Sequence, residues 1–102
     1  MLFRSERLVA DTGNKMTLIL HNHGLLSCGK SVREALDYMY YLERACQAQV
    51  AALAGGCKLI IPSQEIAEGV ARSFERPGYQ ERKGEWRALI RMLDKTDPSY
   101  KT

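Results

Sequence analysis

One short segment constrains the fold of this chain more than any other. Residues 16–21, Met-Thr-Leu-Ile-Leu-His, are almost continuously apolar, partly β-branched and too few for a helix. The turn-forming residues Asn22, His23 and Gly24 end the run. Strands of this kind are usually covered on both faces and flanked by other strands. We therefore predict a strand buried on both faces, followed by a second short strand over Leu25–Cys28.

A long helix from Ser31 to Ala54 is the clearest element of the sequence. Ser31 and Glu34 have the spacing of a capping box, in which each side chain accepts a hydrogen bond from a free N–H of the first turn. Apolar residues then recur at steps of three and four: Val32, Leu36, Met39, Leu42, Cys46, Val50 and Leu53. Gly55 and Gly56 end the helix.

The remaining elements are shorter. A first helix is predicted over Leu2–Ala10, a brief extended segment over Lys58–Ile61, a helix starting at Pro62, a loop over Tyr79–Gly84, and a last helix that contains Trp86 and ends at Asp97. At most two short extended segments are thus available to flank the first strand. A two-stranded ribbon is only marginally stable by itself, so the sequence indicates a part of a larger fold.

Composition excludes several classes of protein. The 102 residues allow one small domain. The net charge of +3 arises from interleaved bases and acids without a Lys/Arg run, so no nucleic-acid partner is expected. The longest apolar stretch, Met16–Leu20, is far too short to span a membrane, so no membrane is expected either. Cys28, Cys46 and Cys57 are odd in number and far apart. Their spacing argues against a disulfide framework and a structural zinc module, and it favours a reducing, cytoplasmic location.

A phosphate-binding loop is a possible alternative interpretation of residues 24–31, which match G-x-x-x-x-G-K-[ST] letter for letter. Such a loop presents successive backbone N–H groups to phosphate, which favours small residues between the glycines. Leu25 and Leu26 instead favour an extended, buried conformation, and no later strand ends in an aspartate that could hold magnesium. We therefore prefer a strand, a turn and a capped helix.

The same region resembles the class II aldolase/adducin family. The resemblance rests on Leu18–Leu26 with its Asn-His-Gly block, on Gly29-Lys30-Ser31, and on Glu34-Ala35 and Leu42-Glu43 in the helix. The ending, with Glu85–Asp94 and Asp97–Tyr100, is similar to the C-terminal extension of the bacterial adducin-like branch. The match runs from about residue 8 to residue 102.

The resemblance implies an α/β fold, as the C-terminal portion of a three-layer α/β/α sandwich with a largely antiparallel sheet. Residues 1–102 would form one partial domain, with a core portion over 1–75 and a C-terminal extension over 76–102. In the family, three histidines hold zinc or another divalent metal, and the metal supports cleavage or epimerisation of sugars and sugar phosphates. His23 matches the third histidine, whereas His21 is expected to be structural.

Other parts of the family's site have no counterpart before Met16: the phosphate-binding stretch, the catalytic Glu and the His-x-His pair. No catalytic and no cofactor-binding residue is therefore assigned, and the only metal-ligand candidate is His23. The expected function is that of a fragment of a metal-dependent aldehyde-lyase or epimerase. Such a fragment is not expected to be catalytically competent alone. Whether the chain is an enzyme is therefore left open. The alternative is a non-enzymatic adducin-like interaction or oligomerisation module.

Partners follow from the same resemblance. The chain is expected to form a homo-oligomer or to require a chain that supplies the N-terminal half, and a small sugar or sugar phosphate is the substrate class of the family. A tyrosine near the C-terminus assists a neighbouring subunit in some family members. Spacing alone does not assign that role to Tyr79 or to Tyr100.

Overall fold

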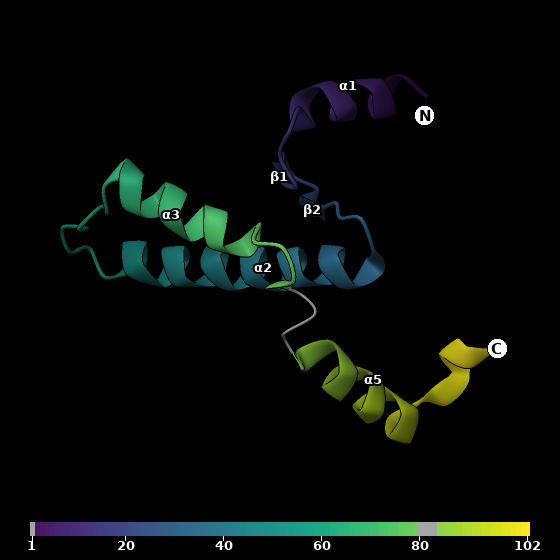
Figure 1. The fold of residues 1–102 in the computed structure, drawn as a ribbon. Helices are drawn as coiled ribbons and strands as arrows, with labels where there is room; N and C mark the ends of the chain where they lie inside the picture. Colours follow the sequence, from purple (N-terminus) through teal and green to yellow (C-terminus); the bar gives the residue numbers. More distant parts are fainter. Residues whose placement is uncertain (1, 80–83) are drawn as a thin grey trace. The chain divides into compact units, whose positions relative to one another are not determined.

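The computed structural model describes residues 2–79 and 84–102 (Figure 1). Its elements, in chain order, are α1 (Leu2–Thr12), β1 (Thr17–Leu20), β2 (Gly24–Ser27), α2 (Val32–Ala54), α3 (Gln64–Phe74), α5 (Glu85–Thr96) and the 3-10 helix η1 (Pro98–Lys101). The chain divides into two compact units, residues 1–59 and 60–102. Each unit is described by itself.

β1 and β2 form an antiparallel hairpin, in which Leu18 lies opposite Leu26 and Leu20 lies opposite Gly24. Two residues at the turn have positive φ: Asn22 at 57° and Gly24 at 87°. Asparagine and glycine are the residues that most readily adopt this left-handed conformation. The predicted pair of strands is confirmed; the first is shorter by one residue at each end than predicted, and the second begins and ends one residue earlier than predicted.

The start of α2 is capped as the sequence indicates. Ser31 has an extended backbone, and its Oγ accepts a hydrogen bond from the Glu34 N–H at 3.2 Å. Glu34 Oε2 accepts in turn from the N–H of Lys30 at 2.6 Å, one residue before the N-cap. A reciprocal cap is thus present, although the backbone donor to the glutamate differs from that of a standard capping box.

α2 packs mainly against β2, and one hydrogen bond and one close backbone approach fix how the two elements meet. Ser27 Oγ donates a hydrogen bond to the main-chain carbonyl of Ala35 at 2.8 Å. At the connection between the two elements, a Cβ on Gly29 would lie only 2.7 Å from the Ala35 backbone nitrogen. Since contacts below 3.0 Å require a shift of the surrounding atoms, this close approach of backbone to helix requires glycine.

Burial differs from the sequence-based prediction. Among residues 6–79 and 84–102 none is buried, and Ile19 in the middle of β1 is 71% exposed. The prediction of a strand buried on both faces is therefore wrong for this chain. The physical reason is that, among the described residues, the sheet consists of the hairpin alone, and α2 packed against it cannot cover both of its faces. The predicted extended segment after α2 forms no strand, and Ile60 within it is 96% exposed.

The second unit contains α3, α5 and η1. Ser63 caps α3 by accepting from the Ile66 N–H at 3.4 Å, and Asp97 caps η1 by accepting from the Ser99 N–H at 3.1 Å. Both predicted helices are confirmed. The predicted loop over Tyr79–Gly84 falls mostly on residues 80–83, outside the described residues. Of the helices that the structure describes, none has the length and apolarity needed to cross a membrane.

Candidate functional site

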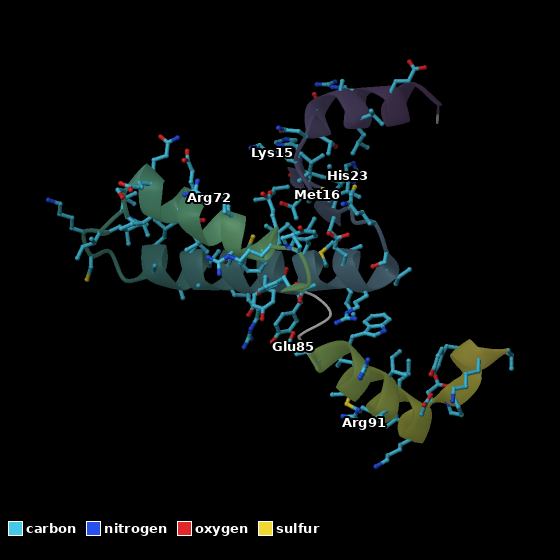
Figure 2. The ribbon with its side chains drawn as sticks, viewed as in Figure 1. Lys15, Met16, His23, Arg72, Glu85 and Arg91 are labelled. Atoms are coloured by element: carbon cyan, nitrogen blue, oxygen red, sulfur yellow. The ribbon has the colours of Figure 1, made fainter. Side chains whose placement is uncertain are left out.

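The hairpin turn presents His23, the residue that the sequence singled out as a metal ligand (Figure 2). Its backbone N–H donates to the carbonyl of Leu20 at 3.3 Å, and its side chain is exposed. The left-handed residues on either side, Asn22 and Gly24, make a tight reversal of the chain. The imidazole therefore lies at the end of the hairpin, where its ring nitrogens can be reached from solvent.

No complete metal site surrounds this imidazole. His21 lies in the same turn and is also exposed. Among residues 2–79 and 84–102, no group of three or more His, Cys, Asp and Glu side chains is arranged to hold a metal ion. A catalytic zinc needs about three protein ligands and an open position. The described residues consequently do not fit a resident catalytic metal, and they assemble no ligand set around His23.

The N-terminus of α2 is occupied by the protein's own carboxylate. Glu34 Oε2 lies 2.6 Å from the Lys30 nitrogen, so the N–H that a phosphate-binding loop would offer to phosphate is already bonded to an anion. Ser31 Oγ satisfies a second N–H, that of Glu34. A fixed negative charge at this position repels phosphate, which supports the interpretation of residues 24–31 as strand, turn and capped helix.

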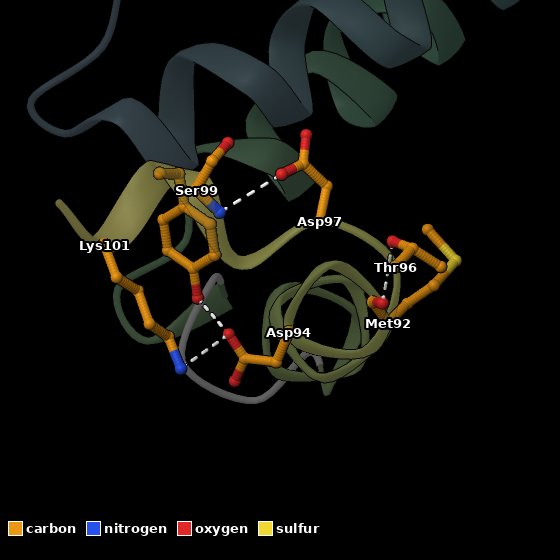
Figure 3. Close-up of polar contacts among 7 residues, drawn as sticks. Met92, Asp94, Thr96, Asp97, Ser99 and Lys101 are labelled. Carbon is orange, nitrogen blue, oxygen red and sulfur yellow. Dashed lines mark hydrogen bonds and ion pairs between the residues drawn. The ribbon is translucent and has the colours of Figure 1, made fainter.

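A polar cluster in the second unit was not anticipated from the sequence (Figure 3). The hydroxyl of Tyr100 donates to Asp94 Oδ1, and Lys101 Nζ lies 2.9 Å from the same oxygen. These contacts hold η1 against α5. In the sequence, Asp97-Pro98 indicates that one helix ends and another can begin. It does not specify which side chains meet after the turn, so the cluster could not be predicted from it.

The cluster shifts the titration of its own members. The hydrogen bond from Tyr100, followed by that from Lys101, lowers the pKa of Asp94 below its ordinary value. The same bonds to Asp94 raise the pKa of the Tyr100 phenol and that of Lys101. Hydrogen bonds from the side chain and backbone of Ser99 lower the pKa of Asp97. Asp94 is half-buried, whereas Asp97, Tyr100 and Lys101 are exposed, and the contacts among them hold η1 locally against the end of α5.

The other candidate residues are placed as follows. The ring of Tyr79 contacts that of Phe74 in a tilted arrangement, with centroids 5.5 Å apart and an interplanar angle of 50°. Both C-terminal tyrosines therefore have partners within their own unit. Cys28 and Cys57 are exposed free thiols, and Cys46 is a half-buried free thiol.

Known proteins resemble this chain over most of its length. Residues 2–50 match the family described as "Class II Aldolase and Adducin N-terminal domain". A Pseudomonas aeruginosa protein whose name places it with the class 2 aldolases is 45% identical over 102 residues, which cover 93% of this chain and 38% of that protein. Alpha-adducin of Rattus norvegicus is 39% identical over 92 residues, which cover 76% of this chain and 12% of that protein.

A solved structure extends the comparison to the fold. The crystal structure of an aldolase II superfamily protein from Pseudomonas syringae matches with a TM-score of 0.77 and 39% identity, covering all of this chain and 41% of that one. The predicted α/β fold of class II aldolase type is thereby confirmed. The chain spans a little over a third of the length of the bacterial relatives that it matches.

Proposed function

The chain belongs to the class II aldolase/adducin family, and on this premise we propose that it is part of a metal-dependent aldehyde-lyase or epimerase acting on sugars or sugar phosphates. The observation that carries the proposal is the exposed His23, placed on a tight turn within the family-matched segment 2–50. In this proposal residues 1–102 form one part of a class II aldolase-type domain, and His23 is the metal ligand that this part contributes.

The chain alone is not competent in this proposal. One imidazole cannot hold zinc tightly, because the affinity of a zinc site depends on several ligands acting together. When bound, a divalent metal in such a site polarises substrate oxygens. The role of this chain's own residues is to hold the imidazole of His23 at the hairpin turn, by means of the left-handed Asn22 and Gly24 and the bond to Leu20.

The test is a chimera in which these 102 residues replace the matching segment of the P. aeruginosa relative. We expect the chimera to retain about one zinc per chain by elemental analysis and to cleave a sugar phosphate. We expect His23→Ala to lose the zinc and His21→Ala, the matched control in the same turn, to retain it. The isolated chain should hold far less than one zinc per molecule. A chimera that keeps its zinc in the His23→Ala variant would contradict the assignment.

A second candidate function is a non-enzymatic, adducin-like interaction or oligomerisation module. The match to alpha-adducin, 39% identical over 76% of this chain, favours it. The chimera separates the two candidates: zinc with cleavage activity supports the lyase, whereas a folded chimera without cleavage of any sugar phosphate supports the module.

Partners and location complete the proposal. We expect either a homo-oligomer or association with a polypeptide that supplies the remainder of the domain, because the hairpin leaves apolar side chains such as Ile19 exposed. A cytoplasmic location is supported by the three cysteines, which are all free thiols.

A further inference from the structure

The two compact units are joined by residues 55–63, a segment that we call the linker. It lies between the end of α2 and the start of α3, and from residue 56 onward it forms no helix or strand. Every residue in it is exposed, with Ile60 at 96% and Ile61 at 77%. The linker is therefore accessible to solvent along its whole length.

The backbone of the linker is unpaired, and its sequence favours an extended conformation. Among the described residues, those from 57 to 62 make no main-chain hydrogen bond to another main-chain group. The β-branched Ile60 and Ile61 favour extended backbone, and Pro62 restricts the residue before it to the same region. An extended stretch with unpaired main-chain groups is the form in which a peptide adds as a strand to a protein groove.

Lys58 is the only base in the linker, and its side chain has no ion-pair partner among the described residues. The next bases on either side are Arg44, inside α2, and Arg72, in the last turn of α3. A peptide bond in a helix must first be opened by local unfolding before a protease can bind it, whereas the linker needs no such opening. Lys58 thus combines a free basic side chain with a peptide bond that is accessible in the folded chain.

The other bases outside helices in residues 2–79 are Lys15, Lys30 and Arg76, and all three are held by hydrogen bonds. The main-chain N–H groups of Lys15 and Lys30 each donate a hydrogen bond, at 2.9 and 2.6 Å, and the carbonyl of Arg76 accepts one at 3.0 Å. Their backbone would have to give up these bonds in order to enter the groove of a protease. Lys58 is therefore the base in this range whose backbone is already free to do so.

We propose that the Lys58–Leu59 peptide bond is a cleavage site for an endoprotease that has a carboxylate in its primary pocket. Water adds across the amide, the C–N bond breaks, and the products carry a carboxylate on Lys58 and an ammonium group on Leu59. The described helices and strands all end before Lys58 or begin after Leu59, so the cut leaves each of them intact. It separates the hairpin and α2 from α3, α5 and η1. Because no metal takes part, this inference stands apart from the proposed function.

Brief digestion of the full chain with a low concentration of trypsin tests the site. The readout is the new amino terminus at Leu59, measured over time by mass spectrometry. Among cuts within residues 1–79, we expect this terminus to appear first. Arg82 and Lys83 lie outside the described residues, and a cut after either of them leaves the readout at Leu59 unchanged.

Two variants separate the effect of the base from that of its backbone. Lys58→Gln removes the charge and should slow the appearance of the Leu59 terminus by at least about tenfold. The double variant Lys58→Gln with Gln47→Lys moves the base to an exposed position inside α2. It should not be cut at position 47 on the same timescale, because the helical backbone there is paired.

Several outcomes would overturn the proposal. The linker would have no advantage if termini after Lys15, Lys30 or Arg44 appeared as fast as the one at Leu59, or if the double variant were cut rapidly at position 47. Absence of the Leu59 terminus, or its unchanged rate in Lys58→Gln, would remove the site. Chymotrypsin, whose primary pocket is apolar, is the last arm. If it cut after Leu59 faster than trypsin cuts after Lys58, the basic specificity would be wrong.

Discussion

The hydroxyl of Ser27 donates a hydrogen bond to the main-chain carbonyl of Ala35 at 2.8 Å, and it thereby ties the last residue of β2 to the first turns of α2. The two residues that this bond joins are eight positions apart in the sequence, and the bond fixes how the hairpin meets the helix. Because the turn that presents His23 belongs to the same hairpin, the Ser27–Ala35 bond also holds the candidate site relative to α2.

Removing this hydroxyl should loosen the hairpin. Ser27→Ala leaves the Ala35 carbonyl without its side-chain donor, and loss of such a bond costs about 1 kcal/mol. We expect faster amide exchange at Leu18 and Leu26, measured by NMR, with little change in the helical signal. Ser27→Thr keeps the hydroxyl and serves as the control. Equal exchange in Ser27→Ala and the unaltered chain would show that the bond adds nothing to the hairpin.

Gly29 should tolerate no side chain. Its Cβ would lie 2.7 Å from the Ala35 backbone nitrogen, and relief of that overlap requires movement of α2 against the hairpin. We expect Gly29→Ala to destabilise the chain by about 1–3 kcal/mol in urea denaturation. Gly84→Ala is the matched control, because a Cβ there meets nothing within 4 Å. A Gly29→Ala variant as stable as Gly84→Ala would contradict the close approach.

The cap of α2 should contribute measurably to its stability. The double variant Ser31→Ala with Glu34→Ala removes both acceptors, and we expect a loss of about 1–2 kcal/mol in urea denaturation followed by circular dichroism at 222 nm. Glu34→Gln retains an acceptor for the Lys30 N–H and should lose less. An unchanged midpoint in the double variant would mean that the helix begins at another residue.

The Asp94 cluster should be visible in the titration of Tyr100. Because the bond to Asp94 raises the pKa of the phenol in the folded state, the stabilisation it supplies is complete below the unfolded pKa and is lost as the pH rises through the folded pKa. The absorbance difference at 295 nm between the unaltered chain and Tyr100→Phe should place the pKa of Tyr100 above its ordinary value. Asp94→Asn should bring it down, and no response to that change would contradict the contact.

The pKa shift of the Asp94 carboxylate has the opposite sign to that of Tyr100, and so does its effect on the pH dependence of stability. Since the pKa of Asp94 is lowered in the folded state, its contribution is present above the unfolded pKa and is lost as the pH falls through the folded value. We therefore expect the contact of η1 with α5 to persist through neutral pH and to open in strong acid, as followed by NMR shifts of Tyr100 and Lys101.

Local signals in the sequence determined the elements and the candidate ligand. The spacing of apolar residues and the cap at Ser31 specified α2, and the residues from Asn22 to Gly24 specified the turn that presents His23. These features depend on residues within about four positions of each other, so they can be read without knowledge of the rest of the fold.

Contacts between elements were decided only by the tertiary structure. Nothing in the sequence specified that Ser27 would bond to Ala35, or that Tyr100 and Lys101 would share the carboxylate of Asp94. The apolar pattern of β1 correctly indicated a strand but wrongly predicted its burial, with Ile19 remaining 71% exposed. Hydrophobic periodicity defines which faces of an element are apolar, whereas burial requires other elements at the right distance to cover those faces.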